Sequence, residues 1–102
     1  MFFIVPSSAP VGLNYSNPLP DSLTLTWRPP PPQHQNGDIV NYLIDFTDLA
    51  SINSTVSITN STSLDVAGLQ PFTSYAFSVS AATAVGFGPA SEHFIVQTAE
   101  DG

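Results

Sequence analysis

The sequence predicts an all-β protein, a sandwich of seven short antiparallel strands in one domain of 102 residues. Strand-like segments recur at short intervals with turn residues between them, and no stretch shows the period of an amphipathic helix. The most specific sign is the run from Leu69 to Tyr75, where Pro71 follows the leucine and the tyrosine leads into an alternating segment. This spacing is typical of a tyrosine corner, in which the ring joins the core and the hydroxyl bonds to the backbone just upstream.

The N-terminal part predicts a tail followed by two strands. Residues 1–7 are expected to be a linker, the domain to span 8–99, and 100–102 to be a C-terminal linker. Val11 to Tyr15 form a first strand at a sheet edge. From Leu23 to Trp27 apolar and polar residues alternate, so Leu23, Leu25 and Trp27 are expected on the buried face.

Prolines and an Asn-Gly pair mark the next connection. Pro29 to Pro32 have no amide hydrogen to donate, so this run is expected to leave the sheet as polyproline. The pair Asn36-Gly37 predicts a tight turn. The next strand runs from Ile39 to Thr47, and its inward residues are expected to be Tyr42, Ile44 and Phe46.

The second half of the chain continues the alternation. The polar segment from Ser51 to Thr62, in which Val56 and Ile58 alternate with polar residues, predicts a short edge strand. Leu64 and Val66 predict the strand that precedes the corner. The inward residues expected in the last two strands are Tyr75, Phe77, Val79, Ala81, Phe94 and Val96.

Composition excludes several classes of partner. With 42% hydrophobic residues the chain can build a core without disulfides, and it has no cysteine. Eight acidic residues stand against one basic residue, Arg28, which gives a net charge of -7. Nucleic acid is not an expected partner, because phosphate binding needs clustered Lys and Arg. No direct membrane insertion is expected, since the apolar runs fall far short of the roughly 20 residues that cross a bilayer.

The chain resembles the fibronectin type III family from Ser8 to Thr98. The residues that carry the resemblance are Pro10, Leu13, Trp27, Pro29, Pro30, Tyr42, Leu69, Pro71, Tyr75, Gly86, Gly88 and Thr98. The resemblance implies an immunoglobulin-like sandwich of three plus four strands, and a role as spacer or ligand-binding module in tandem arrays. The proline run that leads to Asn36-Gly37 is similar to domains of animal cell-surface adhesion molecules and receptor-type phosphatases. The structural core is expected to include Trp27, Tyr42, Leu69, Pro71 and Tyr75.

Three Asn-X-Ser/Thr sequences make Asn14, Asn53 and Asn60 candidate N-glycosylation sites. Asn14 lies between two residues expected to face inward, so its own side chain should face outward. Asn53 and Asn60 lie in polar loop or edge segments. In an extracellular protein at least one of the three is expected to carry a sugar, whereas in an intracellular protein the sequences have no such meaning.

The segment from Val85 to Pro89 is expected to form a hairpin tip between the last two strands, which makes Val85 and Phe87 candidate partner contacts. Several relatives present a cell-binding motif in this loop. The alternative, which we favour, is that Phe87 folds back onto Pro89 or a neighbouring loop. The Arg-Gly-Asp triplet of integrin-binding relatives is absent from the sequence, and so is the Trp-Ser-X-Trp-Ser motif of cytokine receptors.

Nothing in the sequence favours catalysis. His34 and His93 have no nucleophile at an informative spacing, and two lone histidines without cysteine do not suggest a transition-metal site. We therefore expect neither an enzyme nor a cofactor. The single base, Arg28, is expected to be structural, either paired with an acid such as Asp45 or stacked on an aromatic ring.

Together these features predict a non-catalytic module of a cell-adhesion or receptor protein, acting as spacer and protein-interaction unit in a tandem array. Its expected location is extracellular or at the cell surface, within a larger secreted or single-span membrane protein. The expected partners are neighbouring domains of the same chain and an extracellular protein ligand. Two alternatives stay open, an intracellular scaffold of the muscle-filament kind and an accessory domain of a secreted enzyme.

Overall fold

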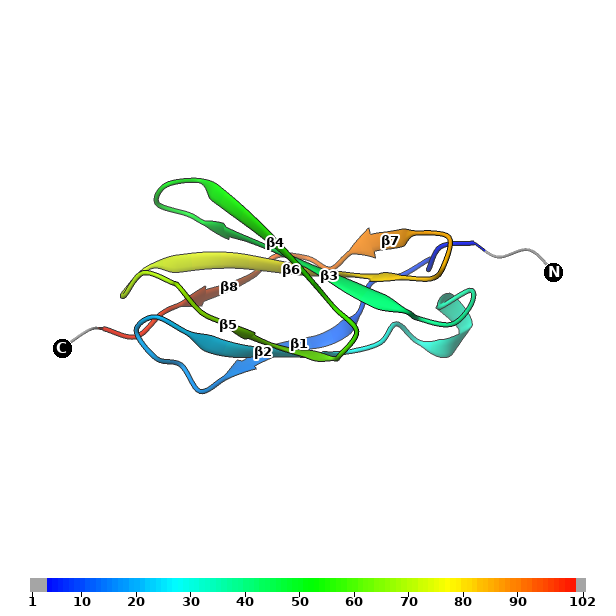
Figure 1. Ribbon diagram of the computed structural model, residues 1–102, viewed down its shortest axis with the longest axis horizontal. Coiled ribbons are helices and arrows are strands. Elements are labelled where there is room, and N and C mark those ends of the chain that lie inside the picture. Colours follow the sequence, from blue (N-terminus) through cyan, green and yellow to red (C-terminus); the bar gives the residue numbers. More distant parts are fainter. Residues whose placement is uncertain (1–3, 101–102) are drawn as a thin grey trace.

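The fold consists of eight strands and one short 3-10 helix in a computed structural model that describes residues 4–100. In chain order the elements are β1 (Val11–Ser16), β2 (Leu23–Arg28), η1 (Pro32–His34), β3 (Asn41–Asp48), β4 (Asn53–Thr59), β5 (Ser63–Val66), β6 (Ser74–Ala82), β7 (Phe87–Ala90) and β8 (Phe94–Gln97). They form two antiparallel sheets packed on each other (Figure 1). One sheet has the order β1-β2-β5, and the other β4-β3-β6-β7, with β8 also paired to β6.

The core lies between the sheets and is built from the alternating side chains of facing strands. Trp27 of the three-stranded sheet meets Tyr42 of the five-stranded sheet edge to face, with ring centroids 5.5 Å apart. Phe46 stacks on Phe77 with centroids 5.3 Å apart. The inward residues predicted for β2 and β3 are confirmed as buried: Leu23, Leu25, Trp27, Tyr42, Ile44 and Phe46.

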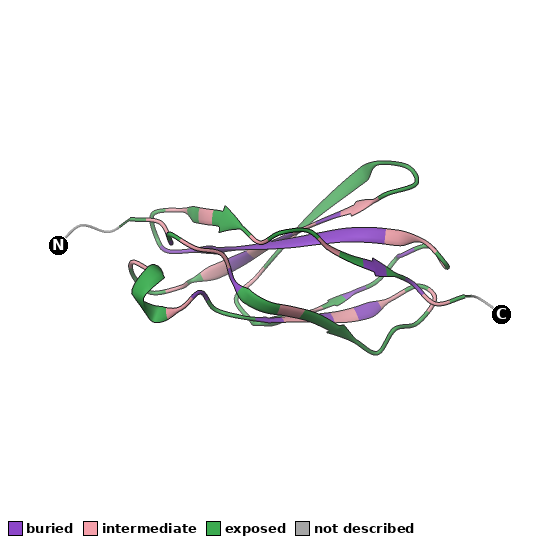
Figure 2. Ribbon diagram, turned by 180° about the vertical axis from the view of Figure 1, so that it is seen from behind, coloured by how far each residue is buried: buried purple, intermediate pink, exposed green. Residues whose placement is uncertain are grey.

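Strand β6 is the most buried element, and both of its faces are shielded from water (Figure 2). Its inward side chains join the core as predicted. On the outward face it carries only small residues, which are Ala76, Ser78, Ser80 and Ala82. Strand β6 has β3 on one side and β7 and β8 on the other, and the residues paired with these small side chains include the larger Leu43, Phe87 and Ile95.

The structure has eight strands where the sequence predicted seven, and its sheets contain three and five strands instead of three and four. The additional strand, β7, lies in residues expected to form a turn. The actual turn is earlier and tighter, because Thr83 and Gly86 exchange two backbone hydrogen bonds of 3.1 and 3.2 Å. Ser91 then separates β7 from β8: its hydroxyl accepts a bond from the Val79 N–H, and its own N–H donates to the Val79 carbonyl, both at 2.9 Å.

The connection between β2 and β3 also differs in part from the prediction. Pro31 has polyproline-like angles of φ -52° and ψ 144°, but Pro32 begins helix η1. Proline is well tolerated there, since the first residues of a helix have no intrahelical acceptor for an N–H. The predicted turn comes next, with Asn36 at φ 58° and Gly37 at φ 141°.

The part of the expected N-terminal linker that the structure describes is packed on the domain. Pro6 is fully buried. The side-chain amide of Asn36 donates to the Val5 carbonyl at 3.1 Å, and the Ser7 N–H donates to the His34 carbonyl at 2.8 Å. This segment therefore behaves as part of the fold. Residues 1–3 and 101–102 of the two expected linkers lie outside the described residues.

The predicted tyrosine corner is present where the chain passes from β5 to β6. Tyr75 is buried, and its hydroxyl oxygen accepts a hydrogen bond from the Gln70 N–H at 2.7 Å. Leu69 is buried in the core, and its N–H donates to the Asp21 carbonyl at 3.0 Å. The Thr98 hydroxyl donates to the Gln70 carbonyl at 2.6 Å. Gln70 is thus held through both of its backbone groups, which leaves the crossing little freedom.

We expect Tyr75→Phe to lower the free energy of unfolding by about 1–3 kcal/mol, because the partly buried Gln70 N–H loses its acceptor while the ring stays in place. Urea denaturation measures the change. Tyr15→Phe is the matched control, since the Tyr15 hydroxyl makes no hydrogen bond within residues 4–100 and the ring is only partly covered. Equal midpoints for the two variants would show that the corner bond does not stabilise the domain.

We expect Gly88→Ala to destabilise the domain by about 1–3 kcal/mol, because the added methyl group would overlap the Pro6 carbonyl oxygen. In a chain that lacks residues 1–7 the same substitution should have little effect, since the obstacle is gone. A double-mutant cycle from denaturation curves measures this coupling. Additive effects would contradict the packing of Pro6 on β7.

Candidate interaction surfaces

The three candidate glycosylation sites all lie on the surface. Asn14 is exposed on β1, an edge strand of the three-stranded sheet. Asn53 is exposed at the start of β4, which is an edge strand of the other sheet, and Asn60 is exposed directly after the end of β4. A glycan at any of these positions would extend into solvent without displacing a buried group. The two sites around β4 would place sugars at both ends of an edge strand that carries no charged residue.

Val85 and Phe87 do not share a hairpin tip. Val85 is exposed in the turn after β6, whereas Phe87 is the first residue of β7 and pairs with Ala82 of β6. Because Ala82 belongs to the outward side of β6, Phe87 lies at the outer face of the sheet. Its role as a partner contact stays a prediction.

Four exposed large apolar residues lie in turns at the other end of the sandwich, and none of them was predicted as a contact from the sequence. Leu19 belongs to the turn between β1 and β2, Leu49 and Ile52 to the turn between β3 and β4, and Phe72 to the turn between β5 and β6. The sequence does contain a sign of such contacts, because each of these large apolar residues interrupts a run of turn formers or small residues. The pattern alone does not tell whether such a side chain folds back onto the core.

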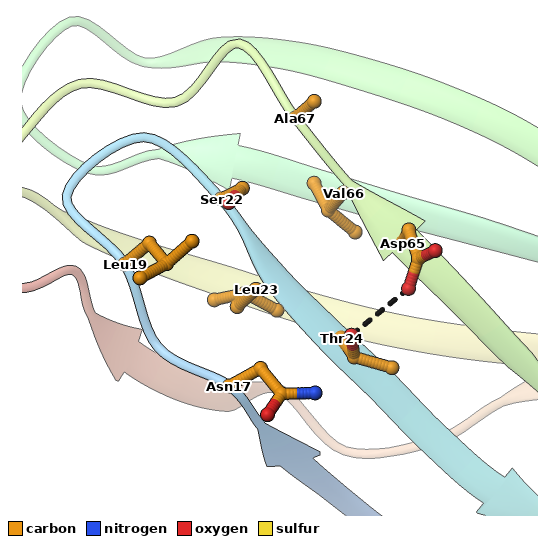
Figure 3. Close-up of a pocket in the computed structure, with 8 residues that line it drawn as sticks. All are labelled: Asn17, Leu19, Ser22, Leu23, Thr24, Asp65, Val66 and Ala67. Atoms are coloured by element: carbon orange, nitrogen blue, oxygen red, sulfur yellow. Dashed lines mark hydrogen bonds between the residues drawn. The ribbon is translucent and has the colours of Figure 1, made fainter.

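An open hollow of about 430 Å³ lies between the β1–β2 turn and strand β5 at this end (Figure 3). Leu19, Leu23 and Val66 supply apolar surface to its lining. On its β2–β5 side the Thr24 hydroxyl donates to the Asp65 carboxylate at 2.9 Å. The hollow is thus mainly apolar with one carboxylate at its rim, and it suits a protruding side chain better than a small charged ligand.

The expected pairing of Arg28 with Asp45 is wrong, because the two residues belong to different sheets. The Arg28 guanidinium lies over Gly12 of β1, where a β-carbon would meet its Nε and Nη2 atoms at 2.9 Å. Asp45 lies on the outward side of β3, opposite Val56 and Ser78. Its Oδ1 atom is buried and has no hydrogen-bond partner within residues 4–100.

The two histidines and Tyr42 lie in surroundings that suggest no catalytic or metal-binding role. The His34 Nδ1 atom lies 3.1 Å from the Ser7 hydroxyl in an exposed contact that joins the N-terminal segment to η1, and His93 is exposed. Burial raises the pKa of the Tyr42 phenol above its ordinary value of 10.0. Among residues 4–100 no three His, Asp or Glu side chains are grouped so that they could hold a metal ion. The same part of the chain contains no helix of the length and hydropathy that a membrane span requires.

Residues 8–97 match the family model of the fibronectin type III domain. Among curated proteins, receptor-type tyrosine-protein phosphatase F of Mus musculus is 38% identical over 87 residues, which cover 85% of this chain and 5% of that protein. Protein sidekick-2 of Mus musculus is 35% identical over 91 residues, which cover 85% of this chain and 4% of that protein. The chain therefore spans about one-twentieth of the length of these relatives.

Solved structures give the same fold. The FN5 domain of Drosophila Lar superimposes with a TM-score of 0.75 at 27% identity, over 95% of this chain and 100% of that one. A crystal structure of titin domains gives a TM-score of 0.81 at 28% identity, over 94% of this chain and 33% of that one. These structures agree with the sandwich architecture described above.

We expect Asp45→Thr to raise the free energy of unfolding by about 1 kcal/mol, because it removes a buried carboxylate oxygen that lacks a partner and places a β-branched residue on a strand. Chemical denaturation near neutral pH measures it. Asp48→Thr should lower the free energy of unfolding, since Asp48 Oδ1 accepts hydrogen bonds from the Ala50 and Ser51 N–H groups at 2.8 and 3.3 Å. A loss of stability in both variants would mean that Asp45 has a partner in solution.

Proposed function

The chain belongs to the fibronectin type III family, and from this premise we propose that it is a non-catalytic module of an extracellular adhesion or receptor protein. In this role it is one link in a tandem array, where it acts as a spacer and as a protein-interaction unit. Its partners are the neighbouring domains of the same polypeptide and an extracellular protein ligand. The whole protein would then be secreted or anchored in the membrane by a single span outside this segment.

The observation that carries the proposal is the similarity to receptor-type tyrosine-protein phosphatase F, at 34% to 38% identity over 87 residues in Danio rerio and Mus musculus. Tyrosine-protein phosphatase Lar of Drosophila melanogaster is 32% identical over 99 residues. In each case the match covers about 5% of the relative, so most of the relative lies outside it. We place this chain in a comparable setting, with any catalytic activity in other domains.

The geometry supports a spacer. The described chain enters the sandwich at one end and leaves it at the other (Figure 1). At the exit, Thr98 bonds to the corner and the Phe72 N–H donates to the Ala99 carbonyl at 3.0 Å. The two ends of the described chain thus lie at opposite ends of the sandwich, so the length of the domain would separate the neighbours that it joins.

The surface supports an extracellular location. Asn14, Asn53 and Asn60 are all accessible to a glycosyltransferase on the folded domain. The net charge of -7 would keep the module soluble and away from anionic membrane surfaces.

A second candidate is an intracellular scaffold of the muscle-filament kind. It is favoured by the superposition on titin domains at a TM-score of 0.81 and 28% identity. In that case the three asparagines would be unmodified. A third, an accessory domain of a secreted enzyme, differs from the main proposal only in the nature of the neighbouring domain.

The test is the mass of the native polypeptide that carries this segment, before and after N-glycosidase treatment. We expect a chain much larger than 10.8 kDa that loses sugar from Asn14, Asn53 or Asn60. Asn17 precedes proline outside any such sequence and serves as the internal control, since it should be unmodified. Bare asparagines in a large chain would favour the intracellular scaffold, and a mass near 10.8 kDa would contradict the tandem array.

A further inference from the structure

We propose that the turns at the end where the chain leaves the sandwich form a contact surface for the next domain of the same polypeptide. We call this the exit surface, and it consists of Leu19, Leu49, Ile52 and Phe72 together with the hollow beside Leu19. The inference rests on the tandem arrangement proposed above and specifies which residues make the junction.

Backbone hydrogen bonds anchor the three turns to the same end of the fold. The Leu69 N–H donates to the Asp21 carbonyl, which joins the β5–β6 turn to the β1–β2 turn. The Leu49 N–H donates to the carbonyl of Ser74, which joins the β3–β4 turn to the start of β6. Both bonds are 3.0 Å long. The β1–β2 and β5–β6 turns are therefore joined directly, and the β3–β4 turn, which stands apart from them in Figure 1, is anchored at its base to β6.

Two of its residues occupy a backbone conformation that suits neither of them. Ile52 has φ 60° and is 79% exposed, and Phe72 has φ 49° and is 59% exposed. Positive φ is unfavourable for large side chains and most of all for β-branched ones. The other two non-glycine residues with positive φ among residues 4–100 are Asn17 and Asn36, a residue type that tolerates this region.

The contrast between Ile52 and Phe72 and the two asparagines indicates that the apolar side chains have a role outside folding. Side chains that remain largely in water add little to the core, and at these positions they also strain the backbone. Folding alone would favour Gly or Asn at both sites, as at Asn17 and Asn36. The isoleucine and the phenylalanine are explained if they become buried against another surface.

The turns also hold these side chains ready for binding. The Ile52 N–H donates to the Asp48 carbonyl at 2.7 Å, and the Thr73 hydroxyl donates to the Pro71 carbonyl at 2.8 Å. An apolar side chain on such an ordered turn loses little further freedom when it is covered. The hollow between the β1–β2 turn and β5 offers a place for a protruding side chain of the occupant (Figure 3).

The path of the chain out of the sandwich favours the next domain of the proposed tandem array as the occupant. The Ala99 carbonyl accepts a hydrogen bond from the Phe72 N–H, so the chain at Ala99 lies beside this part of the exit surface. A domain attached there is present at a high effective concentration and needs only a modest contact to dock. A second copy of this chain has no such advantage, and two domains with a net charge of -7 each repel one another.

The test compares this domain alone with a segment of the native polypeptide that includes the next domain. The double variant Ile52→Asn, Phe72→Asn removes both apolar side chains and places a tolerated residue at each positive φ. All forms are produced in bacteria without N-glycosylation, because the two changes create Asn-X-Ser/Thr sequences at 52–54 and 72–74. Val85→Asn, an exposed apolar residue in a turn at the opposite end, is the matched control. Thermal unfolding is measured for all forms, and NMR relaxation reports whether the two domains tumble as one body.

In the single domain we expect the double variant to keep or raise its unfolding midpoint, by up to about 5 °C, because strain is relieved. In the longer segment we expect the next domain to raise the midpoint of the wild type and of Val85→Asn. The double variant should lose this increase, and its two domains should tumble independently.

Two results would overturn the inference while leaving the proposed function intact. One is equal coupling between the domains in the double variant and the wild type. The other is self-association of the isolated chain that the double variant abolishes, which would assign the surface to a second copy. A native polypeptide with no domain after this one would instead contradict the tandem array itself, and the inference with it.

Discussion

The hydrogen bond from the Gln70 N–H to the Tyr75 hydroxyl, 2.7 Å long, secures the crossing on which the two-sheet arrangement depends. Strand β5 belongs to one sheet and β6 to the other, so the short connection between them determines how the sheets face each other. The Thr98 hydroxyl bonds to the Gln70 carbonyl and accepts a bond from the Thr73 N–H at 2.9 Å. One small cluster therefore governs both the sheet crossing and the path by which the chain leaves the domain.

The two ends of the sandwich differ in a way that matters for assembly. At the entry, the chain's own N-terminal segment covers the fold, with Pro6 fully buried against Gly88 of β7. At the exit, Ile52 and Phe72 are left largely exposed by residues 4 to 100. A module with one end covered by incoming chain and an apolar opposite end is suited to head-to-tail contact, in line with our proposal for the exit surface.

Most residues that are unfavourable for the stability of the domain lie outside the inward faces of β2 and β3, which form the centre of the core. The positive φ angles of Ile52 and Phe72 fall in turns, where the fold would accept Asn or Gly. The buried Oδ1 atom of Asp45 lies on the outer face of a sheet, and nothing in the structure explains its presence. Trp27 is the exception in the core, where its Nε1 is buried without a partner among residues 4–100 while the ring packs on Tyr42.

The sequence by itself determined the fold class, the tyrosine corner and the inward faces of β2 and β3, because strand alternation and corner spacing are local patterns that burial imposes directly. It did not predict β7, the packing of Pro6, or the separation of Arg28 from Asp45, since each depends on which segments meet after the chain has folded. The exit surface belongs to the same group. Leu19, Leu49, Ile52 and Phe72 belong to three separate turns, and only the folding of the strands brings these turns to the same end of the sandwich.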